Sequence, residues 1–303
     1  MRIVMSGGNG FLGSALTRAL RGAGHDVDHL VRPGAPTRPS DVRWDPSAAT
    51  VEMAALEGAE AVVHLSGAGI ADDRWTVARK AELRSSRLDT TRVLVDAVLH
   101  SRHKPRVFVC ASAIGYYGDR GDEILVESSG CGTDFLALLA RDWEAEAVRA
   151  AHGGIRTAML RFGVILSADG GALPQMLRPL RWGVGGRLGS GRQWMSWITL
   201  DDAVRTACNA ISNERYSGPL NVVAPQPARN ADFTRVAAGI LHRPAFLPAP
   251  ALALRLILGE MAQPLLLAST RVRPEMLLRL GFAFRHESIE PALRELIGDE
   301  EHS

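Results

Sequence analysis

Two hydrophobic patterns alternate through the first half of the chain. Short apolar runs, typical of buried strands, are separated by longer segments whose apolar residues recur every three or four positions, as on one face of a helix. This alternation predicts βαβ units around a parallel sheet. The predicted strands are 2–6, 26–32, 42–45, 61–65, 106–110 and 157–166, and the predicted helices are 11–21, 76–101 and 135–152. Prolines at positions 33, 36 and 39 predict a loop after the second strand.

The pattern becomes less regular after residue 166. Thr199 and Asp202 have the spacing of a capping box and predict a helix that begins beside them, and 220–223 reads as a strand. The fold class predicted from both halves is α/β, with a Rossmann-like doubly wound parallel sheet and a smaller C-terminal substrate or cap domain. The expected domains are 1–166, to whose sheet later segments return, and 167–303.

A glycine-rich loop follows the first predicted strand and leads directly into a helix. Glycine lets the backbone turn tightly and approach a pyrophosphate, while the helix N-terminus presents N–H groups to the anion. The spacing fits G-x-G-x-x-G through Gly8, Gly10 and Gly13, and equally G-x-x-G-x-x-G through Gly7, Gly10 and Gly13. The loop therefore predicts a dinucleotide site in residues 1–166, with a glycine turn that binds no ligand as the alternative. The residues expected to bind the cofactor here are Gly7, Gly10, Phe11, Leu12 and Gly13.

The end of the second strand distinguishes between the two nicotinamide dinucleotides. NAD sites usually carry an acidic residue there, which bonds the ribose 2′-hydroxyl, whereas this chain has Arg32. A guanidinium binds a 2′-phosphate that a carboxylate would repel, so we predict NADP over NAD, unless Arg32 is only a solvated loop charge. Leu65, Ser66 and Gly67 end the fourth predicted strand and are expected to contact the adenosine half of the cofactor.

Reductases built on this kind of glycine loop commonly use a tyrosine and a lysine four residues apart, and this chain has no such pair. A lysine four residues after a tyrosine lowers the tyrosine pKa, so that the phenol acts as acid or base. The three tyrosines of this chain are followed four residues later by Arg120, Gly121 and Leu220. The sequence therefore predicts cofactor binding but not the usual hydride chemistry.

Four segments together carry a family resemblance: the glycine loop, 63–67, 112–118 and 189–193, the last followed by Trp197. They resemble the atypical short-chain dehydrogenase/reductases known as epimerase family proteins, which are relatives of the NAD-dependent epimerase/dehydratases. The likeness runs nearly the full length of the chain and includes a C-terminal segment of unknown function.

The resemblance implies further site residues on the long helix. Arg87 would reach a cofactor phosphate or ribose, with Glu82 five residues earlier; the alternative for Arg87 is an exposed partner in an i, i+4 pair. The chain also departs from the pattern of the related reductases. Their catalytic hydroxyl, tyrosine and lysine positions correspond here to Ala113, Leu136 and Ala140.

Tyr117 is the remaining acid/base candidate, because it follows a strand whose end faces the cofactor crevice. Its neighbour Tyr116 stays open as a candidate, and a packed aromatic ring with a satisfied hydroxyl is the alternative for Tyr117. Trp194, Met195 and Trp197 beside Arg192 are candidates to line an apolar substrate pocket with one anion-binding group. Core packing is the alternative and is favoured for Trp197.

Composition adds exclusions. The net charge is +2, from 35 basic and 33 acidic residues, with no run of like charge, so neither nucleic acid nor a membrane is expected as a partner. Three widely spaced cysteines exclude a disulfide framework, and the nine histidines show no ligand spacing, so no metal site is predicted. Charges and a proline interrupt the apolar segment 251–268, and the early glycines exclude a signal peptide. A cytoplasmic location is expected.

The sequence thus predicts an NADP-binding, oxidoreductase-like protein of the short-chain dehydrogenase/reductase type. Its substrate is an unidentified small molecule, and Tyr117 would transfer the proton. A non-catalytic NADP(H)-binding sensor or interaction protein is the alternative, which the missing tyrosine–lysine pair favours. The oligomeric state is left open.

Overall fold

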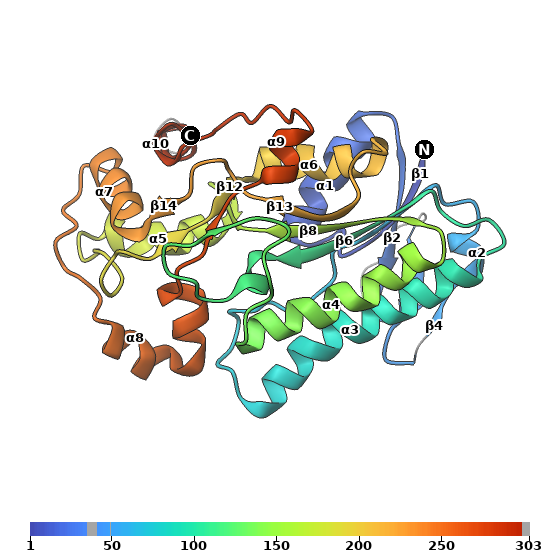
Figure 1. Ribbon diagram of the computed structural model, residues 1–303, viewed down its shortest axis with the longest axis horizontal. Helices are drawn as coiled ribbons and strands as arrows, with labels where there is room; N and C mark the ends of the chain where they lie inside the picture. The colour runs from blue at the N-terminus through green and yellow to red at the C-terminus, as the bar shows by residue number, and fades with distance from the viewer. Residues whose placement is uncertain (35–40, 49, 299–303) are drawn as a thin grey trace. The chain divides into compact units, whose positions relative to one another are not determined.

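The computed structural model describes residues 1–34, 41–48 and 50–298 (Figure 1). Of the three prolines in the predicted loop, those at 36 and 39 lie outside the described residues. Contacts group the chain into two interleaved compact units, and the domain boundary predicted at residue 166 stays a prediction. Unit 1 comprises Met1–Ser112, Leu139–Leu160 and Val204–Leu220, and unit 2 comprises Ala113–Leu138, Arg161–Ala203 and Asn221–Ser303.

An eight-stranded sheet, with the strand order β13-β8-β6-β5-β1-β2-β3-β4, organises unit 1. Its strands are β1 (Arg2–Ser6), β2 (Asp26–Val31), β3 (Val42–Asp45), β4 (Thr50–Val51), β5 (Ala61–His64), β6 (Val107–Ala113), β8 (Arg156–Phe162) and β13 (Gly218–Val222). Pairing is parallel from β6 through β5, β1 and β2 to β3. Among the pairs of this sheet whose register is described, only β3 and β4 are antiparallel. From β1 the chain first extends the sheet through β2 and later, at β5, in the other direction. This is the Rossmann-like doubly wound order that the sequence predicted.

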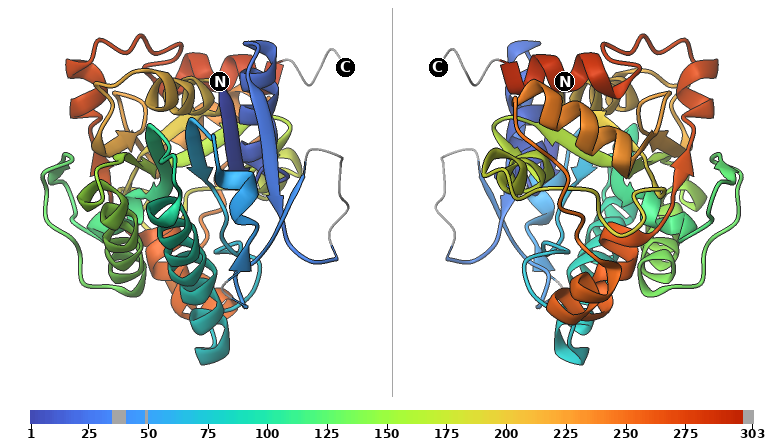
Figure 2. Two further views of the ribbon diagram at one scale, coloured as in Figure 1. Left: turned by 90° about the vertical axis from the view of Figure 1, so that its right-hand side faces the viewer. Right: turned by 90° about the vertical axis from the view of Figure 1, so that its left-hand side faces the viewer.

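Helices cover both faces of this sheet (Figure 1). They are α1 (Phe11–Gly22), α2 (Met53–Leu56), α3 (Val77–His100), α4 (Phe135–His152) and α6 (Leu200–Ser212). Thr76 caps α3, because its hydroxyl accepts a hydrogen bond from the Arg79 N–H at 3.1 Å. α3 and α4 lie side by side (Figure 2) and are joined by ion pairs such as Arg92–Glu146, at 2.8 Å.

The strand predicted at 157–166 is in fact two strands, which belong to different sheets. Gly163 separates β8 from β9 (Val164–Ser167), and β9 pairs with β10 (Gly170–Gly171) and β12 (Trp197–Thr199). The Gly163 N–H bonds the Val222 carbonyl at 3.1 Å, whereas the Val164 N–H bonds the Ser196 carbonyl at 3.0 Å. A Cβ at position 163 would lie 2.7 Å from the Ser196 oxygen. The chain therefore changes partners at a point where only glycine fits.

Unit 2 is built from short elements around a second core. Its remaining elements are the 3₁₀ helix η1 (Ile114–Tyr117), β7 (Ile124–Leu125), α5 (Ala172–Arg181), β11 (Trp194–Met195), β14 (Ala228–Arg229), α7 (Asn230–Ile240), α8 (Ala251–Leu258), η2 (Gly259–Met261), η3 (Gln263–Leu267), β15 (Arg271–Val272), α9 (Glu275–Arg279) and α10 (Ile289–Gly298). Leu173 of α5, Phe233 of α7 and Leu293 of α10 meet in this core. The predicted helix start is confirmed at Leu200, where the Thr199 hydroxyl accepts the Asp202 N–H at 3.4 Å.

Candidate functional site

The glycine loop closes on itself immediately after β1. The Gly10 N–H donates to the Gly7 carbonyl at 3.0 Å, and Gly7 has a φ of +75°, which side-chain-bearing residues rarely adopt. A Cβ at Gly7 would lie 2.7 Å from the Leu65 carbonyl carbon, and one at Gly13 would overlap the Gly7 carbonyl oxygen. Glycine is therefore required at both positions to fold this turn between β1, β5 and α1.

Gly8 is required for a different reason. A Cβ there would lie 2.6 Å from the imidazole ring of buried His29. The Thr17 hydroxyl donates to the Gly13 carbonyl at 2.8 Å, so its oxygen accepts from His29 Nε2 at 2.9 Å. The two glycine spacings left open by the sequence therefore both have a structural basis, since Gly7 and Gly8 each make a contact that excludes a side chain.

The N-terminus of α1 is open to an anion. Gly10 is its N-cap residue, and neither a capping side chain nor an acidic residue in the first turn satisfies the helix N-terminus. The first-turn N–H groups, at Phe11, Leu12 and Gly13, are the donors that a pyrophosphate would use. The loop therefore has the geometry to hold a dinucleotide.

The end of β2 carries a positive charge and no carboxylate. Ser6 of β1 lies opposite Leu30 of β2, so exposed Arg32 follows β2 just beyond the level of the glycine loop. Asp28 lies earlier in β2, and Arg2 holds its carboxylate at 2.9 Å. Within the described part of the chain, Arg32 makes no ion pair. Its guanidinium is therefore available to a phosphate.

The end of β5 lies directly against the glycine loop. The Leu65 N–H donates to the Ser6 carbonyl at 3.1 Å, and Gly67 packs against the guanidinium of Arg87. Arg87 donates to the carbonyls of Leu83 at 3.1 Å and Ala68 at 3.0 Å. The structure thus places residues 65–67 between the glycine loop and the side chain of Arg87, in unit 1.

Arg87 is half-buried rather than an exposed helix partner. Its guanidinium stacks on the Trp143 ring at 5.3 Å. Burial, together with the charge of Arg79, lowers the pKa of Arg87 to about 10, so the group stays cationic at neutral pH. Glu82 lies elsewhere on α3: it is exposed and pairs with Arg79 at 2.7 Å, while Arg79 donates to the Gly69 carbonyl. A cofactor role for Glu82 stays a prediction.

His64 supports the strand that leads into the glycine loop. In the sequence it was only a polar residue in an apolar strand. Thr90 donates to the Ser86 carbonyl at 2.8 Å, so its oxygen accepts from His64 Nε2 at 3.2 Å. His64 Nδ1 then accepts the Ser6 hydroxyl at 2.6 Å. Burial, and secondarily the charge of Arg87, lowers the pKa of His64 to about 3. The neutral ring joins β1, β5 and α3.

We expect His64 to make the protein sensitive to acid. The unfolded chain binds a proton at this site below pH 6.5, whereas the folded protein does so only near pH 3, so the stability that depends on neutral His64 is lost as pH falls from about 6.5 toward 3. The loss is about 1.4 kcal/mol for each pH unit. Urea unfolding between pH 4 and 7 should give a steeper pH dependence for the wild type than for His64→Asn. Equal slopes would contradict this role for His64.

Tyr117 lies in unit 2 and is fully buried. Its hydroxyl donates to Asn221 Oδ1 at 2.6 Å and accepts from Arg161 Nη1 at 2.9 Å. Burial raises the pKa of Tyr117 to about 12, against the opposing effect of Arg161. The guanidinium of Arg161 also stacks on Tyr116, 3.6 Å from the ring centroid. These are the features of a packed ring with a satisfied hydroxyl, and the acid/base role of Tyr117 stays a prediction.

The family positions of the catalytic side chains hold no proton carrier. Leu136 lies against Gly115, whose Cβ would be 3.4 Å away, and Ala140 is buried. Ser112 is adjacent to the expected hydroxyl position, but its hydroxyl donates to the buried carboxylate of Glu144 at 2.6 Å. The structure therefore places no tyrosine, lysine or free hydroxyl at the catalytic positions of the related reductases that are described here.

The two tryptophans of the predicted apolar pocket have different surroundings, and a pocket beside Trp194 stays a prediction. Trp197 is buried in the core of unit 2, which confirms the core-packing alternative. Trp194 is covered by two guanidinium groups, those of Arg229 at 4.4 Å and Arg271 at 4.6 Å. Its Nε1 donates to Asp122 at 2.6 Å. The exposed Arg192 stays an unassigned cation.

The described residues show neither a metal-binding cluster nor a membrane-spanning helix. Among the described residues, no group of three or more His, Cys, Asp or Glu side chains could hold a metal ion. Nor does the described part of the chain contain a helix long and apolar enough to cross a membrane.

A doubly wound parallel sheet, with an open glycine loop after its first strand, defines the class of α/β folds that carry dinucleotide sites. The model of the NAD dependent epimerase/dehydratase family matches residues 3–222, and the chain belongs to that family. Residues 249–296 match a domain of unknown function, DUF1731. The resemblance to atypical short-chain dehydrogenase/reductases is thereby confirmed, since the curated relatives are named epimerase family proteins.

Three relatives illustrate the match. The epimerase family protein MT2273 of Mycobacterium tuberculosis (strain CDC 1551 / Oshkosh) is 42% identical over 291 residues, which are 96% of each chain. The crystal structure of human epimerase family protein SDR39U1 (isoform 2) with NADPH gives a TM-score of 0.90 at 33% identity, covering 98% of this chain and 99% of that one. A nucleoside-diphosphate sugar epimerase from Corynebacterium glutamicum gives a TM-score of 0.82 at 36% identity, covering 99% of this chain and 58% of that one.

Proposed function

We propose that this protein binds NADP(H) at the glycine loop and acts as a cytoplasmic oxidoreductase on a small carbonyl or hydroxyl compound. The observation that carries the proposal is exposed Arg32, free of ion pairs to the described residues, at the end of the strand beside an uncapped helix N-terminus. The human relative, solved with NADPH, supports the same cofactor type.

The residues of unit 1 fit this cofactor. Gly7 and Gly13 close a turn that no side chain could enter, which leaves the N–H groups at the start of α1 for the pyrophosphate. Arg32 would bind the 2′-phosphate, and the backbone at 65–67 would contact the adenosine half. The partly buried hydrogen bond from Arg87 to the Ala68 carbonyl holds the residue that directly follows this segment. When bound, the nicotinamide would supply hydride transfer.

NADP(H) is expected to bind at least about tenfold more tightly than NAD(H), and Arg32→Ala should remove this preference. A hydrogen-bonded ion pair with the 2′-phosphate contributes about 1.5–3 kcal/mol, and 1.4 kcal/mol corresponds to tenfold in affinity. Calorimetric titration of both cofactors against both proteins measures the effect. Arg102→Ala, which removes an exposed arginine from the loop after α3, is the matched control and should leave the preference unchanged. Equal affinities in the wild type would exclude NADP selectivity.

A non-catalytic NADP(H)-binding sensor is the second candidate. Two observations favour it. The hydroxyl of Tyr117 is already held by Asn221 and Arg161, and Leu136 and Ala140 occupy the positions of the family's tyrosine and lysine. Turnover assays over a broad panel of carbonyls, alcohols and UDP-galactose distinguish the two. We expect slow or absent epimerisation of UDP-galactose. Tight NADP binding without turnover on any compound would select the sensor.

A further inference from the structure

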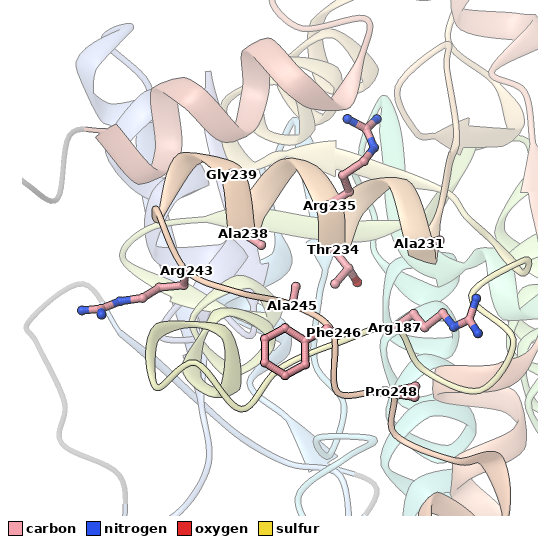
Figure 3. Close-up of a pocket in the computed structure, with 10 residues that line it drawn as sticks. All are labelled: Arg187, Ala231, Thr234, Arg235, Ala238, Gly239, Arg243, Ala245, Phe246 and Pro248. Carbon is pink, nitrogen blue, oxygen red and sulfur yellow. The ribbon is translucent and has the colours of Figure 1, made fainter.

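Unit 2 contains a cavity of about 530 Å³ that the proposed function does not use (Figure 3). Its lining comes from α7, from the segment that follows it, and from one residue of the loop after α5. The lining residues are Arg187, Ala231, Thr234, Arg235, Ala238, Gly239, Arg243, Ala245, Phe246 and Pro248. A cavity of 300–1,000 Å³ is the size that small-molecule ligands occupy.

A helix-ending turn creates the cavity. His242 follows α7 with a φ of +50°, the left-handed conformation that ends many helices, and the Arg243 N–H donates back to the Ala238 carbonyl at 3.0 Å. The chain then returns along α7 as an extended segment, 243–248. This segment is fixed at its far end, where the Ala249 N–H donates to the Arg187 carbonyl at 2.9 Å.

Small side chains on α7 leave the space between the helix and the returning segment unfilled. Ala231, Thr234 and Ala238 are spaced three and four residues apart, so they lie on one face of α7. Figure 3 shows Thr234 directed from the helix toward the segment that carries Ala245 and Phe246. The Phe246 side chain is 74% exposed, so its ring is available to a ligand. The walls are therefore mostly apolar, with one hydroxyl.

Two cations flank this apolar space. Figure 3 shows Arg187 and Arg243 on opposite sides of the cavity, each with its guanidinium group directed outward, away from Ala245 and Phe246. Neither side chain forms an ion pair or a hydrogen bond with any residue that the structure describes. Arg235 differs, because it pairs with Asp232 at 3.6 Å and points away from the returning segment. The unmatched charge of the cavity is therefore positive.

We propose that this cavity binds an organic anion with an apolar body, of the class of medium-chain or aromatic carboxylates. The apolar walls would cover the body, and the carboxylate would lie at the outer edge of the cavity, where Arg243 or Arg187 would pair with it. Nine of the ten lining residues lie between residue 222, where the epimerase family match ends, and residue 249, where the second match begins. The site is independent of the glycine loop, since no predicted cofactor residue lines it.

The test uses the whole protein and anilinonaphthalene sulfonate, a fluorescent anion with an aromatic body. We expect saturable binding that decanoate displaces at least about tenfold more effectively than decanol, because only decanoate can pair with an arginine. Arg243→Gln should weaken dye binding by about tenfold. Arg294→Gln removes a charge from α10 in the same unit and is the matched control, which should leave binding unchanged.

A second variant removes part of the cavity wall without threatening the fold. Phe246 lines the cavity but is 74% exposed, so Phe246→Ala should fold as the wild type does while weakening dye binding by about tenfold through the loss of ring contact. Trp182→Ala removes another exposed aromatic ring of unit 2, one that does not line the cavity, and is its control. Unchanged dye binding in Phe246→Ala, or displacement by decanol as effective as by decanoate, would overturn the proposal.

Discussion

A Gly10→Val variant is expected to lose about a hundredfold or more in NADP(H) affinity while remaining folded. Gly10 has a φ of −75° and a ψ of 173°, which valine adopts without strain, and its Cβ would lie 3.3 Å from the Gly7 carbonyl oxygen. The added side chain would stand at the N-terminus of α1, where the pyrophosphate is expected. Loss of two hydrogen bonds to a charged group, each of about 1.5–3 kcal/mol, accounts for a hundredfold or more.

Variants at two other glycines serve as controls for Gly10→Val. Gly22→Val lies at the far end of α1 with open space around it, so it should bind the cofactor as the wild type does. Gly13→Val would force a side chain into the Gly7 carbonyl and should destabilise the protein itself. Titration by NADPH fluorescence, with circular dichroism to verify folding, separates the three. Normal binding by folded Gly10→Val would show that the loop is only a structural turn.

The parts of the fold that sequence reasoning predicted are those fixed by local pattern. The segment from β1 through the glycine loop into α1 depends on residues adjacent in sequence, so the glycine spacing was sufficient to predict its structure. The break at Gly163 could not be predicted, because both flanking segments form strands. Their separation depends on distant partners, the carbonyls of Ser196 and Val222.

In the candidate site, too, local patterns could be predicted from the sequence, whereas contacts between distant residues could not. Sequence reasoning placed Gly67 and Arg87 near the cofactor, with an exposed Arg87 in an i, i+4 pair as the alternative. The structure turns its guanidinium inward onto Trp143, which lies 56 residues further along the chain. The bond between His64 and Ser6 likewise joins residues 58 apart. Sequence patterns cannot show which buried polar groups meet, so they could not give the network that supports the loop.

Tyr117→Phe is expected to lower the free energy of unfolding by about 1–3 kcal/mol, because it leaves Asn221 and Arg161 without the hydroxyl that now satisfies both. The pH dependence gives a sharper signature. The pKa of Tyr117 is raised from 10.0 to about 12, so the unfolded chain releases this proton first. Wild-type stability should therefore fall by about 1.4 kcal/mol for each unit between pH 10 and 12, and this contribution should disappear in the variant.

Tyr116→Phe is the matched control, since no hydrogen bond of its hydroxyl to a described residue is present, and it should preserve both stability and its alkaline pH dependence. Chemical unfolding of the three proteins from pH 8 to 11 measures the difference. If a substrate is identified, the acid/base hypothesis requires Tyr117→Phe also to reduce the rate by about 10²–10⁴-fold at unchanged NADP affinity. A large fall in rate without a loss of stability would assign Tyr117 to the chemistry. A loss of stability with little change in rate would assign it to the buried network with Arg161.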